Sequence, residues 1–503
     1  MAKNVAPGLE LKVRSLGRDD AFPSNLVQFG CLRVLFNCPI ELSRFVAETS
    51  RDKVQEDRVC ASDHWSCLDQ YVPVLSGAAR ELLASVDVIL LTHPLHCLAL
   101  PYVTERSRFK GRIIAPEGAI DGIFSTLQEL VCYLRSKEAI NDQCENTPVK
   151  QPRLDSTLSK HREPFLTVDE IQGCLSKIEG VRYNETLRLY SSNAVAINDT
   201  STSMELQTLV DVFAIPSGVT IGGCNWKLSI GNQSFVFVSH LNTQASYHPL
   251  PAPSLKSILQ STGTFFFSLC LPIAPPYRKS NYNHSVESHQ SWNSLGINER
   301  FEYIGNLVEK YVKRGGRVLL PVFPYASVLQ LLEVVAQKLI DSKIITDRKP
   351  TGSDGNPSSA SHTAAGQSLL YISPVATTSL KRSNTTMEWL SHERHQRVYR
   401  AEEPFEHMKL VRNGSLCLYD SLEQIPNATR EILTHSAHGR SQSSDSSAGL
   451  VAFAGHASLR GGPAQAILQR WSLPGRKQKS KPTEKSKDSA DKGSPGDLLL
   501  LVE

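Results

Sequence analysis

The apolar pattern of the chain centres on one buried strand and the turn that follows it. Residues 86–91 form an almost unbroken apolar run, which is typical of a strand covered on both faces. The strand ends at Thr92, because Pro94 removes a backbone donor and fixes a turn. His93 and His96 follow just past the carboxyl end of the strand, the edge at which open α/β sheets place their sites. The pattern therefore predicts a candidate site at this turn.

Short strands and helices surround this element in the first half of the chain. Thr167 and Glu170 form a capping box, which predicts a helix through about residue 178. The apolar runs predict further helices at about 97–104 and 120–134. They also predict strands at 9–13, 25–29, 32–36, 112–115, 186–190, 209–215, 225–230, 234–239 and 265–271.

The second half alternates helices with apolar strands, a pattern typical of a parallel α/β sheet. Helices are predicted at about 299–313, 325–337, 380–392 and 459–471, and strands at 317–320, 369–372, 450–454 and 498–502. We therefore predict two domains, over residues 1–272 and 273–503. Polar, low-complexity insertions near 273–298, 351–367, 434–448 and 475–496 are expected to be disordered.

Composition narrows the classes of protein. The hydrophobic share of 40% and the charged share of 21% are those of a globular protein. A net charge of +4 is too small to indicate a nucleic-acid binder by itself. The eleven cysteines are scattered singly, which favours a reducing compartment and argues against zinc fingers. Without a signal peptide or a long apolar run, no membrane partner is expected.

The turn after the central strand resembles the metal signature of the metallo-β-lactamase fold, in the branch that carries a β-CASP domain and processes RNA. That signature reads His-x-His-x-Asp-His, followed by Ala-Leu-Pro. Aligned on Ala99–Leu100–Pro101, His93 matches the second histidine and His96 the last. Leu91 replaces the first histidine, and Leu95 replaces the aspartate. The resemblance implies an αββα sandwich with an inserted α/β β-CASP domain, both incomplete at the C-terminus.

Three further positions that bear ligands or support them in these nucleases differ here. Asn37 stands where the third strand of the family ends in an aspartate. Val219 replaces the histidine of a Gly-His-x-x-Gly loop, and Leu241 replaces the aspartate that bridges two metals. The resemblance therefore implies that an amide and aliphatic side chains occupy most of the ligand positions of the site.

This substitution pattern argues against metal chemistry. A hydrolytic zinc needs three protein ligands and an open position for water, but only His93 and His96 remain metal-capable among the aligned positions. We therefore expect no catalytic residue and no bound zinc, with an apolar pocket filled by aliphatic side chains. The two histidines are then structural and hydrogen-bonded, and the alternative is a retained metal site.

Two other places are candidates for contact with RNA. His456 precedes the helix predicted from residue 459, and Arg460 lies in its first turn. Active relatives contact RNA phosphate at this helix N-terminus; helix capping is the structural alternative. The basic run at 476–481 fits a nuclear-import signal, an RNA contact or a solvated loop.

Several stretches resemble a non-catalytic branch of the family more closely, namely 86–105, 171–190, 217–226, 315–333, 370–390 and 453–460. The resemblance implies a nuclear scaffold that pairs with a catalytic paralogue, in a complex that processes small nuclear RNA 3′ ends and cleaves nascent transcripts. RNA would be bound indirectly or weakly. The alternatives are an active zinc-dependent RNA endonuclease and an RNA-binding module in its own right.

The family continues past the length of this chain, through the rest of β-CASP and a C-terminal dimerisation domain. We therefore expect a C-terminally truncated chain that associates weakly with its partner.

Overall fold

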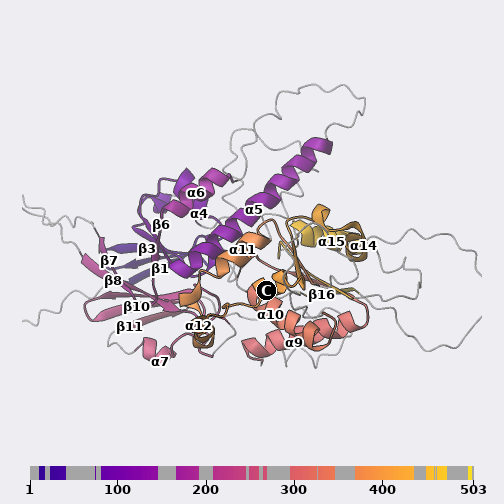
Figure 1. The fold of residues 1–503 in the computed structure, drawn as a ribbon. Coiled ribbons are helices and arrows are strands. Elements are labelled where there is room, and N and C mark those ends of the chain that lie inside the picture. The colour runs from indigo at the N-terminus through magenta and orange to yellow at the C-terminus, as the bar shows by residue number, and fades with distance from the viewer. Residues whose placement is uncertain are drawn as a thin grey trace, which may run out of the picture. The chain divides into compact units, whose positions relative to one another are not determined.

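The chain divides into two units in the computed structural model (Figure 1). The first comprises Met1–His284 and Thr386–Glu402, and the second comprises Ser285–Thr385 and Glu403–Glu503. The pattern of the sequence predicted a single boundary after residue 272. The structure describes residues 11–16, 23–40, 74, 81–144, 166–191, 208–244, 248–259, 264–268, 295–325, 327–345, 369–434, 449–457, 459, 462–472 and 497–500.

The first sheet of unit 1 runs in the order β1-β2-β3-β4-β5-β6. Its strands β1 to β3 are antiparallel, and β3 to β6 are parallel. They span Leu11–Ser15, Asn25–Phe29, Leu32–Phe36, Val88–Leu90, Arg112–Pro116 and Ile178–Val181. The carboxyl ends of β3 and β4 therefore lie next to each other at one edge.

The second sheet of unit 1 runs in the order β11-β10-β9-β8-β7. Strands β7 to β10 are antiparallel, and β10 pairs with β11 in parallel. They span Thr186–Ser191 (β7), Thr208–Pro216 (β8), Cys224–Ile230 (β9), Gln233–Val238 (β10) and Thr264–Ser268 (β11).

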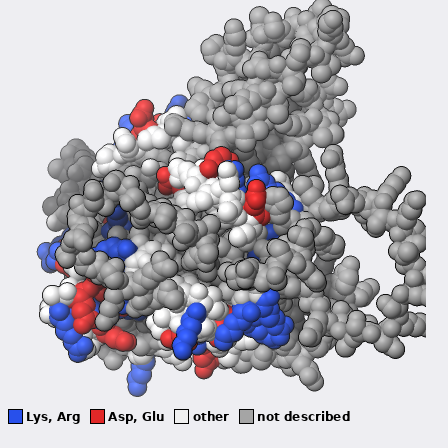
Figure 2. All heavy atoms as spheres, turned by 45° about the vertical axis from the view of Figure 1, so that its right-hand side comes forward, with Lys and Arg blue, Asp and Glu red and all other residues white. Residues whose placement is uncertain are grey.

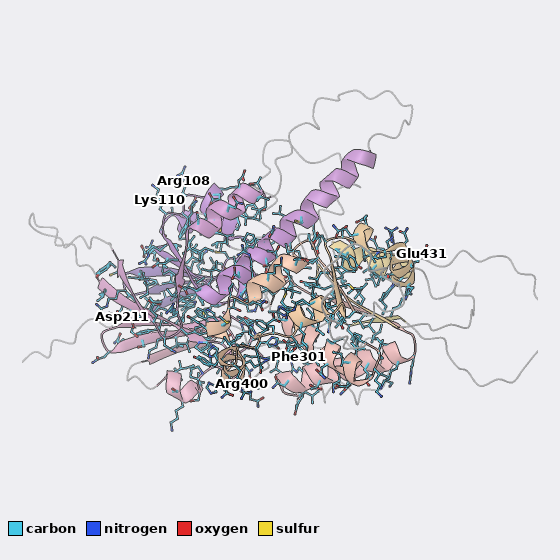
Figure 3. The ribbon with its side chains drawn as sticks, in the orientation of Figure 1. Arg108, Lys110, Asp211, Phe301, Arg400 and Glu431 are labelled. Carbon is cyan, nitrogen blue, oxygen red and sulfur yellow. The ribbon has the colours of Figure 1, made fainter. Side chains whose placement is uncertain are left out.

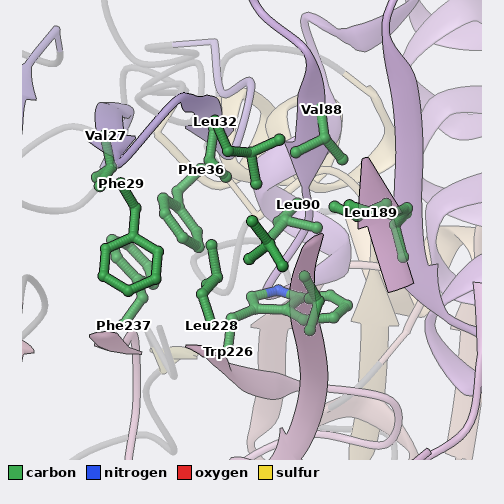
Figure 4. Close-up of a cluster of buried hydrophobic side chains, with 14 of the residues drawn as sticks. Val27, Phe29, Leu32, Phe36, Val88, Leu90, Leu189, Trp226, Leu228 and Phe237 are labelled. Carbon is green, nitrogen blue, oxygen red and sulfur yellow. The ribbon is translucent and has the colours of Figure 1, made fainter. Parts of the chain in front are cut away.

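The two sheets pack face to face through alternate residues of their strands (Figure 4). On β4, Val88 and Leu90 join this core. On β3 the ring of Phe36 stacks on Phe237 of β10, with 3.9 Å between the centroids. Trp226 of β9 is fully buried in the same core. Side chains alternate across a strand, so the intervening residues face the helices outside.

Helices cover the outer faces of both sheets. The first sheet is covered by α4 (Leu100–Arg106), α5 (Glu117–Cys144) and α6 (Val168–Ser176) (Figure 1). The second is covered by α7 (Leu255–Ile258). These layers form an αββα sandwich, the architecture that the resemblance implied. The Thr167–Glu170 capping box is also confirmed. The predicted helix does not reach residue 178, because Ile178 begins β6.

Unit 2 is a parallel α/β layer structure, as expected for the inserted domain. Its sheet runs in the order β14-β13-β15-β12-β16, and all its strand pairs are parallel. These strands span, in that order, Leu416–Tyr419, Leu369–Ile372, Leu450–Ala454, Arg317–Pro321 and Asp497–Leu499. The helices are α9 (Ile297–Lys313), α10 (Ser327–Asp341), α11 (Ala376–Ser383), α13 (His407–Arg412), α14 (Asn427–Thr434) and α15 (Gly462–Ser472).

One segment of the second half of the chain packs with unit 1. The single helix predicted at 380–392 is wrong: α11 ends at Ser383, a 3₁₀ turn spans Met387–Trp389, and α12 spans His392–Tyr399. Arg400 follows the end of α12 (Figure 3). The helix breaks because the tertiary contacts of Trp389 override the local helical pattern.

Trp389 anchors this segment in unit 1. Its ring packs edge-on against Tyr183 with 4.4 Å between centroids, and its carbonyl accepts from Leu250 N at 3.1 Å. A Cβ at Gly118 on α5 would lie 2.4 Å from the indole ring. Only glycine leaves room for the indole at this position.

The four predicted insertions lie almost entirely outside the described residues. Among the helices that the structure describes, none has both the length and the apolar composition needed to cross a bilayer.

The contact between Gly118 and Trp389 predicts a sign reversal in stability. Gly118→Ala should destabilise unit 1 by about 1–3 kcal/mol, because the new methyl group overpacks against the indole. In a Trp389→Ala background, which itself costs about 3 kcal/mol or more, the same change should stabilise by up to about 1 kcal/mol through helix propensity. Urea unfolding of the wild type, the two single variants and the double variant measures these changes. Additive effects of the two substitutions would contradict the packing of Trp389 on Gly118.

Candidate functional site

The candidate site is built on the turn that follows β4. His93 caps the 3₁₀ helix η2 (Pro94–Cys97), since its backbone is extended and its Nδ1 accepts from Leu95 N at 3.1 Å. Backbone bonds join this turn to the end of β3: Cys38 N donates to His96 O, and Ala99 N donates to Cys38 O, both at 2.8 Å. The turn is therefore held to the neighbouring strand by its main chain.

Three histidines meet at this edge of the sandwich: His93 and His96 are buried, and His240 is half-buried. The ring centroids of His93 and His96 lie 5.2 Å apart, and those of His240 lie 5.8 and 5.9 Å from them. His240 follows β10 of the second sheet, so the cluster spans both sheets. Sequence reasoning missed His240 as a site residue. Its signal was its place two residues past the end of a buried strand.

A chain of hydrogen bonds runs beside these rings. Asn37 Oδ1 accepts from both the backbone N and the Oγ1 of Thr92, at 2.9 and 3.0 Å. Thr92 Oγ1 also lies 3.1 Å from Ser239 Oγ, which lies 2.8 Å from His240 Nδ1. Thr92 Oγ1 lies 3.4 Å from His96 Nδ1 as well.

Asn37 has a backbone that suits its place at the end of β3. Its φ is +65°, a left-handed conformation that asparagine tolerates better than most residues. It is fully buried, and its Nδ2 has no hydrogen-bond partner among the described residues. The side chain therefore acts as an acceptor, joining the end of β3 to the end of β4.

The expectation of a pocket filled by four aliphatic side chains is wrong. Leu91 is buried and its carbonyl accepts from Trp226 Nε1 at 3.0 Å. However, Leu95 and Val219 are only half-buried, and Leu241 is 37% exposed. The interior is instead the polar chain of Asn37, Thr92 and Ser239 with the histidines, because the strand ends bring backbone donors there that need partners.

The donor set does not fit a hydrolytic zinc. Within the described part of the chain, no three His, Cys, Asp or Glu side chains are arranged to hold a metal ion. Burial raises the pKa of the nearby Cys38, Cys97 and Cys224 thiols well above the usual range, so these thiols are protonated at neutral pH.

Burial also sets the charge of the histidines. It lowers the pKa of His96 to about 3 and that of His240 to about 4. Burial, with His96 and His240 nearby, lowers the pKa of His93 as well. All three rings are therefore neutral at pH 7, which lets them pack together without repulsion between like charges.

The contact with RNA predicted at His456 and Arg460 is placed differently in the structure. His456 is buried and meets Phe323 edge-on, with 4.9 Å between centroids. The following helix begins at Gly462 rather than at residue 459, so His456 does not lie in its first turn. Arg460 lies outside the described residues.

Removing the Asn37 acceptor should destabilise unit 1. Asn37→Ala leaves two Thr92 donors without their acceptor and adds left-handed strain, so we expect a loss of about 3 kcal/mol. Asn37→Gly removes the acceptor without the strain and should cost about 1 kcal/mol less than Asn37→Ala. Urea unfolding measures both variants. Equal and negligible losses in the free energy of unfolding would show that the Asn37 amide does not contribute to stability.

Acid should destabilise unit 1 through the histidine cluster. The unfolded histidines take up protons near pH 6.5, whereas the folded His96 and His240 do so only near 3 and 4. Stability is therefore complete above about pH 6.5 and lost as pH falls towards the folded pKa values, by about 2 kcal/mol per histidine between pH 7 and 5. Unfolding free energies at the two pH values test this.

His240→Gln should reduce this dependence on pH, whereas the matched control His392→Gln, at an exposed position, should retain it. An unchanged slope in His240→Gln would exclude the cluster as its origin.

The chain is similar to several known proteins. No family model matches the chain. Integrator complex subunit 9 of Homo sapiens is 26% identical over 92% of the chain, and its homologue in Nematostella vectensis is 23% identical over 92%. Endoribonuclease YSH1 of Candida albicans is 22% identical over 52% of the chain and 25% of its own length.

A solved B3 metallo-β-lactamase with an active-site glutamic acid is 12% identical, with a TM-score of 0.22 over 46% of this chain and 62% of its own. The matched regions cover 63% of the human relative and 64% of the Nematostella relative. Over nearly its whole length, this chain is similar to Integrator complex subunit 9.

Proposed function

We propose that this chain is a non-catalytic subunit of the Integrator complex. In this role it is a nuclear scaffold for the RNA endonuclease subunit, Integrator complex subunit 11, with which it forms a heterodimer. It also contacts other subunits, such as subunit 4. The pair acts in small nuclear RNA 3′-end processing and in cleavage of nascent transcripts, and RNA is bound by this chain only weakly or indirectly.

The observation that carries the proposal is the use of Asn37. A carboxylate at this position would support a metal. Here an amide is committed to the backbone and hydroxyl of Thr92 at 2.9 and 3.0 Å. Without a cation beside it, a carboxylate in this fully buried place would be an unpaired charge and costly. An amide keeps the acceptor without the charge.

The remaining ligand positions support the same interpretation. Leu91, Leu95, Val219 and Leu241 offer no metal donor. His93 is engaged through Nδ1 as a helix cap, which is a structural role. His240 adds a third ring to the cluster, but no three donor side chains in the described part of the chain are arranged to hold a metal ion. We therefore propose that the chain holds no zinc and catalyses no hydrolysis.

The proposal of a scaffold rests on similarity over most of the fold. The relatives that align over 92% of the chain carry the name of an Integrator subunit, and the sandwich core of unit 1 is continuous and well packed. The alternative, an active zinc-dependent RNA endonuclease, is favoured by the similarity to an endoribonuclease over half the chain.

One experiment separates the two functions. The chain is co-expressed with Integrator complex subunit 11, and the pair is purified through a tag on this chain. We expect a weakly associated pair, recovered at low salt, whose RNA cleavage is unchanged by His93→Asn with His96→Gln in this chain, because neither ring serves the reaction. Asn at position 93 preserves a cap acceptor. Elemental analysis of this chain alone should give less than one zinc per molecule.

Two results would contradict the proposal. Loss of cleavage in the His93→Asn, His96→Gln pair, with complex recovery unchanged, would assign catalysis to this chain. Failure to recover subunit 11 with the wild-type chain would remove the scaffold role.

A further inference from the structure

The outer face of α9 in unit 2 carries a line of basic and aromatic side chains. Tyr303, Asn306, Lys310 and Lys313 recur at intervals of three and four, so they follow one side of the helix. Tyr303 is 51% exposed, and the other three are exposed as well. The opposite face is buried, as marked by Phe301 (Figure 3).

The C-terminal end of this line is hollowed. Asn306, Glu309, Lys310, Lys313 and Arg314 line an open hollow of about 320 Å³. The lower part of the face in Figure 2 shows a group of Lys and Arg side chains at the height of α9. Three cations and one carboxylate give the hollow a net charge of +2.

The single carboxylate is already neutralised. Glu309 Oε1 accepts from Lys313 Nζ and from Ser342 Oγ, both at 2.5 Å. In contrast, Lys310 and Arg314 make no side-chain ion pair with any residue in the described part of the chain. Two cations are therefore available to an external anion.

Helix stability explains only part of this arrangement. Cations near a helix C-terminus interact favourably with the helix dipole, which accounts for basic residues in the last turn. It does not require an exposed aromatic ring two turns earlier. Surfaces that bind single-stranded nucleic acid combine these two features, with cations for phosphates and aromatic rings for bases.

We infer that the outer face of α9 binds single-stranded RNA, with Lys310 and Arg314 on backbone phosphates and Tyr303 stacked on a base. At a rise of 1.5 Å per residue, Tyr303 and Lys310 lie about 10 Å apart along the axis. This is about the length of three stacked nucleotides at 3.4 Å each. The site goes beyond the proposed function and does not depend on it.

Direct binding tests the site. A fluorescein-labelled 20-nucleotide polyuridine is titrated with the full chain between 50 and 200 mM salt, and the anisotropy gives the Kd. Lys310→Ala with Arg314→Ala should weaken binding about tenfold at 100 mM salt and reduce the slope of log K against log salt by about 1.4. Thermal melting confirms that these exposed changes leave the fold intact.

A matched control removes the same number of positive charges from another helix of unit 2. Lys409 and Arg412 on α13 are exposed and paired with Glu406 and Glu403. Replacing both by alanine removes the same charge from unit 2 and should change the Kd by less than about twofold. Tyr303→Ala should weaken binding about fivefold or more, whereas Tyr303→Phe should retain it, because stacking needs only the ring.

Three outcomes would overturn the inference. The first is that the wild-type chain does not bind the RNA at 50 mM salt. The second is that the control variant loses as much affinity as the variant of Lys310 and Arg314. In the third, a polyglutamate peptide or inorganic phosphate displaces the RNA at matched ionic strength, which would assign the hollow to an acidic protein segment or to a small anion.

Discussion

The two hydrogen bonds between Asn37 and Thr92 hold the edge of the sandwich on which the rest of unit 1 depends. Strands β3 and β4 end side by side, and the turn after β4 runs through the interior. Buried backbone donors there need acceptors, and one amide oxygen supplies them for both the N–H and the hydroxyl of Thr92. From Thr92 the bonds continue to Ser239 at the end of β10, so one short polar chain joins both sheets.

Neutral groups carry the polar contacts at this edge of unit 1, where strand ends of both sheets converge. These groups are the amide of Asn37 and the imidazoles of His96 and His240, whose pKa values are lowered by burial. Neutral groups avoid the cost of unpaired buried charges. The edge is thus held by hydrogen bonds of modest individual strength.

The sequence predicted those parts of the fold in which burial is strongest. Strands β2, β3, β13 and β15 begin and end where their apolar runs do, because burial leaves little choice of residue there. The edge strand β14 was missed although its four residues are apolar, and three of them are only half-buried. His240 was missed for another reason. It reaches the site from the second sheet, and the sequence pattern does not show that the end of β10 lies close to the turn after β4.

The break after α11 had a similar cause, because its reason lies in Gly118, far away in the sequence. The segment Thr386–Glu402 that follows has a consequence for synthesis. Unit 1 recruits residues made after the first hundred residues of unit 2. On a ribosome adding roughly 5–20 residues per second, His284 emerges roughly 6–24 s before Glu402. During that interval the Tyr183 and Gly118 surfaces await Trp389, and unit 2 begins to form before unit 1 is closed. The two units are therefore interleaved in time as well as in sequence.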